Sequence, residues 1–231
     1  MLSDFRGTHL HESSGWGHPC AGTHVDWGLI MPAIRTVVVD FGFTLCSEHY
    51  FNRLGPEMSA RASKILFGAK SDMTDRWMSG LATSRDVAAY LSGFLDMSAD
   101  SIHEKLVSGC SDMHFNDAVW SFVKRQHEAS RKLALVTTNA DIFSDVVVPA
   151  HGLNDVFDMI VNSADYGARL ESKRPMWDRA FEALGAGHGY DGALLVEDTL
   201  KEVRLFRELG GQAYHYKDDA SFAAWLESAG L

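Results

Sequence analysis

The chain has 231 residues, which is enough for a sizeable buried core in one domain or in a domain with an insertion. Its formal net charge of -10 argues against a nucleic-acid surface and favours a small-molecule substrate held in a local cationic pocket. No apolar run approaches the length of a membrane span, so we expect no membrane partner. Three widely spaced cysteines, Cys20, Cys46 and Cys110, favour a reducing cytoplasm over a disulfide framework.

Residues 1–33 differ from the rest of the chain. They are rich in Gly and His and have neither a sustained apolar period nor the layout of a signal peptide. His18, Cys20 and His24 are metal-binding residue types, but their spacing fits no standard zinc pattern. We expect a flexible N-terminal extension without catalytic residues.

The first predicted strand is Val37-Val38-Val39, an apolar run that ends at Asp40. Continuous β-branched runs are typical of parallel strands that are buried on both faces. Ligands of open parallel sheets bind just beyond the carboxyl ends of the strands. Asp40 therefore stands where a nucleophile or a metal ligand would lie.

Residues 47–130 change from a strand pattern to a helical one. Pro56 opens the first predicted helix, and Thr83-Ser-Arg-Asp86 resembles a capping box. Four helices are predicted in this segment: Pro56–Phe67, Thr83–Leu95, Ala99–Cys110 and Asn116–Ala129.

Strands and helices alternate after residue 130, as a parallel sheet requires. The predicted strands are Leu133–Thr137, Asp158–Val161, Ala193–Val196 and Ala213–Tyr216. The predicted helices are Asp141–Ala150, Pro175–Leu184, Leu200–Leu209 and Ala220–Ser228. The expected fold class is α/β: residues 34–46 and 131–231 form a Rossmann-like parallel sheet flanked by helices, and the helical segment interrupts it.

Four motifs lie at the ends of these elements: Asp40-Phe-Gly-Phe-Thr44, Thr138-Asn139, Ser172-Lys-Arg-Pro175 and Glu197-Asp198-Thr199. In this order they resemble the four motifs of the haloacid dehalogenase (HAD) superfamily of hydrolases, from Arg35 to Leu231. The resemblance implies that residues 47–130 are a small α-helical cap, which closes over the substrate and excludes water.

The resemblance further implies a magnesium-dependent phosphatase of a small phosphorylated metabolite. Asp40 would be the nucleophile and form an aspartyl-phosphate. Its carboxylate, the backbone carbonyl of Gly42 and Asp198 would bind Mg²⁺, and Glu202 would support the metal. Glu197 stands where the family often has Gly.

The remaining implied roles concern the phosphoryl group and the substrate. Thr138 would hold phosphate oxygens, and Lys173 or Arg174 would pair with the nucleophile and the phosphoryl group. Lys is the usual family residue, whereas Arg174 directly precedes the proline, so the choice stays open. Four further residues are candidates for substrate contact: Thr44, Asn139, His49 and Arg53, the last two because they closely follow the catalytic strand.

Gly42 is the important departure from the family pattern. Typical phosphatases of the family have a second Asp here, which protonates the leaving alcohol and later activates water. Such general acid catalysis contributes a factor of about 10² to 10⁴, and Gly cannot provide it. Phe43, where the pattern normally has Gly, adds bulk beside the site.

Relatives that lack the second Asp define the alternatives. Some sugar-phosphate phosphatases have Gly there and remain hydrolases, which favours phosphomonoester hydrolysis. Phosphonoacetaldehyde hydrolase instead uses a cap lysine, for which Lys64 or Lys70 is available. Haloacid dehalogenases work without metal and fit the Glu197-Asp198 pair poorly. A degenerate domain that binds a ligand or partner without turnover is the last alternative.

Overall fold

The computed structural model describes residues 33–68 and 71–231. The predicted N-terminal extension, with His18, Cys20 and His24, lies outside the described residues, as does Lys70. Within the described ranges no helix combines the length and apolar character that crossing a membrane requires.

Five parallel strands form one sheet in the order β3-β2-β1-β4-β5. The strands are β1 (Thr36–Val39), β2 (Lys132–Thr137), β3 (Met159–Asn162), β4 (Ala193–Glu197) and β5 (Gln212–His215). Val39 of the central strand is in register with Leu135 of β2 and Val196 of β4. The residues that follow these positions, Asp40 and Glu197 among them, therefore meet at one edge of the sheet.

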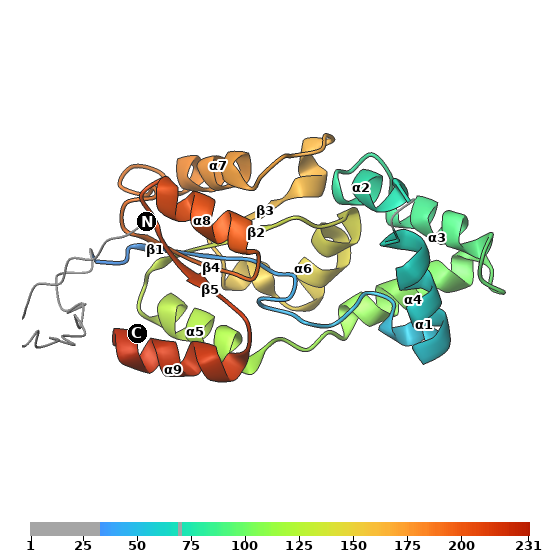
Figure 1. Cartoon of the computed structure of the whole chain (residues 1–231), viewed down its shortest axis with the longest axis horizontal. Helices are drawn as coiled ribbons and strands as arrows, with labels where there is room; N and C mark the ends of the chain where they lie inside the picture. The colour runs from blue at the N-terminus through green and yellow to red at the C-terminus, as the bar shows by residue number, and fades with distance from the viewer. Residues whose placement is uncertain (1–32, 69–70) are drawn as a thin grey trace, which may run out of the picture. The chain divides into compact units, whose positions relative to one another are not determined.

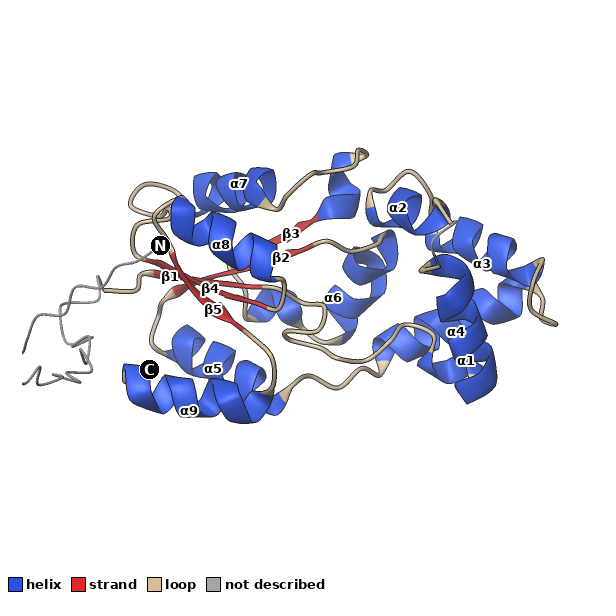
Figure 2. Ribbon diagram, in the orientation of Figure 1, coloured by secondary structure: helices blue, strands red, loops and turns tan. Residues whose placement is uncertain are grey.

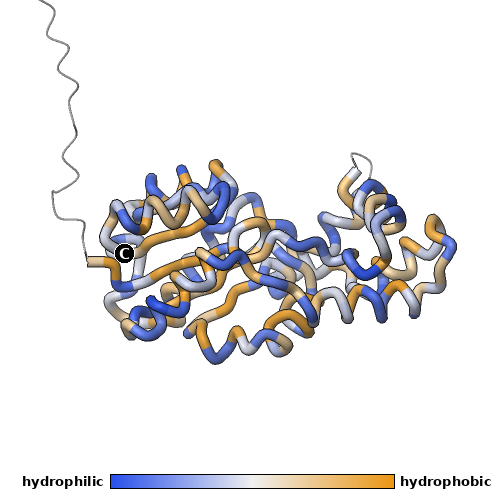
Figure 3. The backbone as a smooth tube through the Cα atoms, turned by 90° about the horizontal axis from the view of Figure 1, so that it is seen from below, coloured by the Kyte–Doolittle hydropathy of each residue, from blue (hydrophilic) through white to orange (hydrophobic). Residues whose placement is uncertain are grey.

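Helices cover both faces of the sheet (Figures 1 and 2). On one face, α7 (Arg174–Leu184) and α8 (Leu200–Glu208) pack around Val38. On the other, α5 (Asp117–Glu128) and α9 (Asp219–Ala229) pack around Val37 and Val39. Figure 3 shows hydrophobic runs along the strands and mixed hydropathy along the helices. This arrangement confirms the predicted α/β class.

The predicted helix Asp141–Ala150 is present, but its middle turn is wider than that of an α-helix. It contains a π-helix, η2 (Phe143–Val147), that continues into α6 (Val148–Ala150). Short π-helical turns inside α-helices are rare and often occur at functional sites. Here the widened turn follows Asp141, a residue that contacts the inserted segment.

The inserted segment contains the short helix η1 (Asn52–Leu54) and four α-helices before α5. These are α1 (Pro56–Leu66), α2 (Met73–Met78), α3 (Ser84–Ser92) and α4 (Ala99–Ser111). The capping box at Thr83 and Asp86 is formed. The expected cap range 47–130 also includes α5, which packs on α9 through Phe122 and Phe222, with ring centroids 5.5 Å apart. This last helix of the insertion therefore belongs to the layers around the sheet.

Asp141 joins the insertion to the sheet domain through partly buried hydrogen bonds. Its carboxylate accepts the backbone N–H of Ser84 at 2.8 Å, the Ser84 hydroxyl at 2.5 Å and the Trp77 indole N–H at 2.9 Å. Gly80 has a φ of +72°, and a Cβ there would lie only 2.0 Å from the carbonyl oxygen of Ala164. The turn between α2 and α3 therefore packs against the core at backbone distance.

We predict that Asp141→Ala lowers the free energy of unfolding by about 1–3 kcal/mol, because it leaves the backbone N–H and the hydroxyl of Ser84 without their acceptor. The Trp77 N–H keeps its 3.1 Å bond to the Ser84 hydroxyl. Urea unfolding followed by tryptophan fluorescence measures the change. The control is Asp145→Ala, which removes an exposed carboxylate from the same helical segment. Equal destabilisation by the two substitutions would contradict the role of Asp141.

Candidate active site

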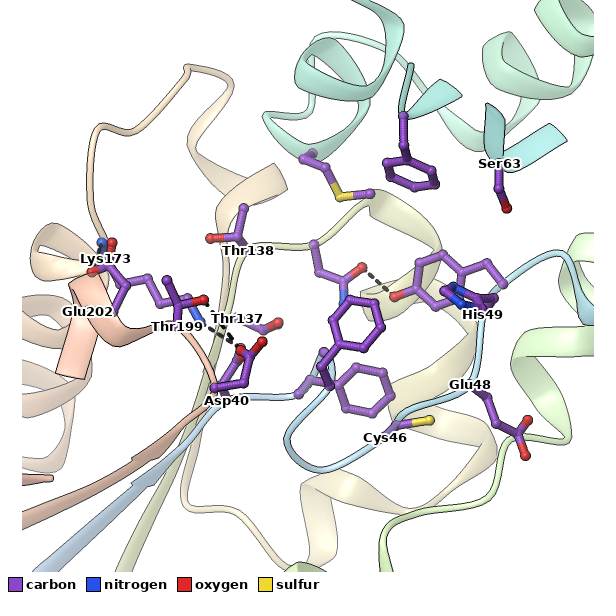
Figure 4. A pocket seen from close by; sticks show the side chains of 18 of the residues that line it. Asp40, Cys46, Glu48, His49, Ser63, Thr137, Thr138, Lys173, Thr199 and Glu202 are labelled. Carbon is purple, nitrogen blue, oxygen red and sulfur yellow. Dashed lines mark hydrogen bonds and ion pairs between the residues drawn. The ribbon is translucent and has the colours of Figure 1, made fainter. Parts of the chain in front are cut away.

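Lys173 lies between two buried carboxylates at the carboxyl edge of the sheet. Its Nζ is 2.7 Å from Asp40 Oδ1 and 2.7 Å from Glu197 Oε2. Asp40 follows β1, Glu197 ends β4, and Lys173 immediately precedes α7. Figure 4 shows the Lys173 side chain extending toward Asp40. Three separate parts of the chain thus form one charged cluster.

Burial and charge act on each member of this cluster. Burial raises the pKa of Asp40 to about 6 against the opposing effect of Lys173, and Glu197 adds to the increase. Burial also raises the pKa of Glu197, and Lys173 again opposes it. Burial alone lowers the pKa of Lys173, but the two carboxylates raise it above its usual value. The ammonium group therefore stays charged.

A divalent metal ion fits the acidic part of the site. Carboxylate oxygens of Asp40, Glu197 and Asp198 lie within 4.8 Å of one another. Three ionised carboxylates and one ammonium carry a net charge of about -2, which a divalent cation would balance. An all-oxygen donor set is the kind that Mg²⁺ prefers.

Glu202 lies beside this cluster but is not among the three converging carboxylates. Its Oε2 accepts the backbone N–H of Lys173 at 3.1 Å, across 29 residues of sequence. That bond fixes the backbone from which the Lys173 side chain extends. A supporting role of Glu202 toward a metal stays a prediction.

A cavity of about 440 Å³ lies between Asp40 and the inserted segment. Its size is that of a pocket for a small metabolite. The sheet domain and the loop after β1 provide these lining residues: Asp40, Phe41, Gly42, Phe43, Cys46, Thr137, Thr138, Asn139, Lys173, Asp198, Thr199 and Glu202. The insertion provides Glu48, His49, Tyr50, Phe51, Ser63, Phe67 and Met78 (Figure 4).

Lys173, and not Arg174, is the cation that the structure brings to Asp40. Arg174 has a side chain that is 57% exposed, and its Nε lies 3.6 Å from Asp178 on the next turn of α7. The other predicted site residues that line the cavity are Asp40, Gly42, His49, Thr138, Asn139, Asp198 and Glu202.

Two predicted substrate contacts lie away from the cavity lining. Thr44 is fully buried, and its hydroxyl has no hydrogen-bond partner among the described residues. Arg53 pairs with Asp112, and both line a second groove of about 410 Å³ that adjoins the cavity at Glu48 and His49. A role of Thr44 toward a substrate therefore rests on the sequence resemblance, and a role of Arg53 rests on its nearness to Asp40 in the sequence.

The structure adds two contacts that the sequence did not predict. Glu197 holds Lys173, and the Tyr50 hydroxyl donates a hydrogen bond to Asn139 Oδ1. Burial raises the pKa of Tyr50 well above its usual value, so the hydroxyl stays a donor. The sequence did contain a signal for the contact of Glu197 with Lys173. Glu197 is an acid at the end of an apolar strand, and a buried carboxylate needs a cation nearby.

No protein-family model matches the sequence, and no curated protein matches it significantly. Solved structures do match. A HAD-like family hydrolase from Porphyromonas gingivalis has a TM-score of 0.62 at 15% identity, over 86% of this chain and 98% of its own. A HAD family enzyme from Bacteroides thetaiotaomicron, in complex with magnesium and inorganic phosphate, has a TM-score of 0.58 at 16% identity, over 80% and 95%.

L-2-haloacid dehalogenase from Xanthobacter autotrophicus is also similar, with a TM-score of 0.57 at 17% identity, over 85% of this chain and 83% of the dehalogenase. These neighbours include a magnesium- and phosphate-bound enzyme and a dehalogenase. Identities this low establish the fold alone. The order of the strands, the position of the insertion and these similarities together show that the chain has the fold of the HAD-like hydrolases.

Proposed function

We propose that the protein is a magnesium-dependent phosphatase of a small phosphorylated metabolite, with Asp40 as its nucleophile. The observation that carries the proposal is the contact of the buried Asp40 carboxylate with Lys173, beside Asp198 and at the floor of the cavity. A phosphoryl group needs a nucleophile and cations close together, and this edge of the sheet supplies both.

In the proposed reaction an oxygen of Asp40 attacks phosphorus, and the bond from phosphorus to the ester oxygen breaks. The departing alkoxide takes a proton from water and leaves as the alcohol, and an aspartyl-phosphate remains. Water then attacks this phosphorus, which returns the Asp40 carboxylate and releases inorganic phosphate. Lys173 holds the nucleophile and balances negative charge on the phosphoryl oxygens, which Thr138 would also contact. Bound Mg²⁺ would add further charge neutralisation.

The leaving alcohol receives no proton from position 42. A Cβ at Gly42 would meet no heavy atom within 4 Å, and Gly42 does not have a positive φ. The backbone at position 42 therefore accepts a Cβ without a clash. Without a carboxylate there, an ester with an acidic leaving alcohol has the chemical advantage.

The phosphonoacetaldehyde-hydrolase alternative has less support. Lys173 is the single lysine among the described residues that line the cavity. Lys64 is exposed and does not line it, and Lys70 lies outside the described residues. The dehalogenase alternative is also weaker, because the three converging carboxylates favour a cation.

A panel of phosphate esters, phosphonates and haloacids, each with and without magnesium, tests the proposal as a whole. We expect magnesium-dependent release of phosphate from esters. Release of halide without metal would replace the proposal with dehalogenation. Inertness toward the whole panel, with intact fold and magnesium binding, would favour a binding domain.

We predict that Asp40→Asn lowers the rate of phosphate release by about 10⁴-fold or more, because the amide is a poor nucleophile toward phosphorus. Circular dichroism and thermal unfolding should show a folded protein. Asp145→Asn is the matched control, since it changes an exposed carboxylate outside the cavity lining. Wild-type turnover in folded Asp40→Asn would refute the mechanism.

A second prediction concerns Asp198. Asp198→Asn should weaken magnesium binding at least about tenfold, because one of three converging carboxylates loses its charge. In metal-free buffer the same variant should be as stable as the wild type or slightly more stable, because repulsion falls. Calorimetric titration with magnesium and thermal unfolding measure the two effects, and an unchanged affinity would count against the metal assignment.

The third prediction concerns Gly42→Asp. The new carboxylate should raise turnover of alkyl phosphates more than that of aryl phosphates, because alkyl leaving groups depend more on a donated proton. The dependence of kcat on the acidity of the leaving alcohol, compared between the two proteins, is the measurement. A uniform change across the series would mean that residue 42 has no part in leaving-group protonation.

A further inference from the structure

Two exposed phenylalanines line the cavity. Phe43 is 58% exposed and Phe67 is 57% exposed, and they are the most exposed of the large hydrophobic side chains in the described residues. Phe43 lies in the loop after β1, and Phe67 directly follows the last residue of α1. Exposed apolar side chains that converge on one pocket are typical of a ligand-binding surface.

The backbone of Phe43 is strained. Its φ is +55°, in the left-handed region, which is unfavourable for a residue other than glycine. The loop is held by hydrogen bonds from the Phe43 N–H to the Cys46 carbonyl at 2.8 Å and from the Cys46 N–H to the Phe41 carbonyl at 2.9 Å. Strained residues of this kind cluster at functional sites. Glycine would avoid both the strain and the exposure, so neither stability nor solubility accounts for Phe43.

Phe43 also has an aromatic neighbour. The rings of Phe43 and His49 have centroids 5.8 Å apart and lie edge to face at 72°. Both rings line the cavity, and Tyr50 follows directly in the chain. Edge-to-face and offset packing of a further ring at such a surface is favourable beyond the burial of apolar area.

The charges around the cavity exclude a second anionic group on the substrate. Lys173 is the single lysine or arginine among the described lining residues, and it is already paired with Asp40 and Glu197. Besides Asp40, the lining contains three further acidic residues: Glu48, Asp198 and Glu202. A carboxylate or second phosphate on the leaving group would meet negative charge without a partner.

From these observations we propose that the substrate is a phosphate monoester whose leaving group is aromatic and uncharged, and that Phe43 and Phe67 bind its ring. Phe43 is then the residue that determines specificity. This inference rests on the proposed phosphatase function, which it narrows to one substrate class. It concerns binding of the ring, and not the acidity of the leaving alcohol.

Two esters separate these effects. Benzyl phosphate has a ring but a weakly acidic leaving alcohol, whereas 2,2,2-trifluoroethyl phosphate has an acidic leaving alcohol and no ring. We expect a KM about tenfold lower for benzyl phosphate than for the trifluoroethyl ester. A negative charge on the ring, in 4-carboxybenzyl phosphate, should raise KM several-fold above that of benzyl phosphate.

Phe43→Gly removes the ring and relieves the strained backbone, so the variant should be at least as stable as the wild type. Its KM for benzyl phosphate should rise about five- to tenfold, while KM for the trifluoroethyl ester changes less than twofold. Phe43→Leu should give an intermediate KM. The matched control is Phe94→Ala, because Phe94 is an exposed aromatic of the insertion outside the cavity lining, and it should change neither KM.

Equal KM values for the two esters in the wild type would overturn the inference and leave the phosphatase proposal intact. So would an equal change for both esters in Phe43→Gly. If no ester is hydrolysed, the phosphatase proposal fails, and calorimetry with magnesium then decides the binding question. Tighter binding of benzylphosphonate than of methylphosphonate, lost in Phe43→Gly, would support the aromatic site, and equal binding would overturn it.

Discussion

The ammonium group of Lys173, placed between Asp40 and Glu197, is the contact on which the rest of the candidate site depends. Each carboxylate alone would be a buried, uncompensated charge, and together they would repel. The register of β1 with β4 brings the two acids to one edge, and the start of α7 supplies the cation. Glu202 fixes the backbone at that start. Sheet pairing and charge pairing therefore position Asp40 together.

The sequence predicted the sheet well because parallel strands are buried on both faces. Apolar runs such as Val37-Val38-Val39 leave little choice of structure, and the observed strand bounds differ from the predicted ones by a residue or so. The packing partner of α5 was not predictable in the same way. An amphipathic pattern reveals that a helix has an apolar face but not which surface that face meets. The π-helical turn after Asp141 likewise follows from tertiary contacts.

Strand ends also made part of the site predictable, since ligands of parallel sheets collect there. Asp40 and Asp198 lie at strand ends, where that rule expects ligand-binding residues, and Thr138 and Asn139 line the same cavity. The choice between Lys173 and Arg174 depends on which of the two side chains points toward Asp40 at the start of α7. The presence of Pro175 in the sequence does not determine that direction. Thr44 and Arg53 are close to Asp40 in sequence, but the chain turns after Asp40. Nearness in sequence therefore does not show whether a side chain points into the cavity.

The cavity has two kinds of wall that come from different stretches of the chain. The polar floor consists mainly of residues at strand ends, whose positions the sheet fixes, whereas the apolar side includes residues from the loop after β1 and from the insertion. Asp141 and Gly80 hold the insertion on the core without contributing to the cavity lining. Substitutions on the apolar side, Phe43 of the loop included, can therefore change the shape of the cavity while the sheet keeps the strand-end residues in place.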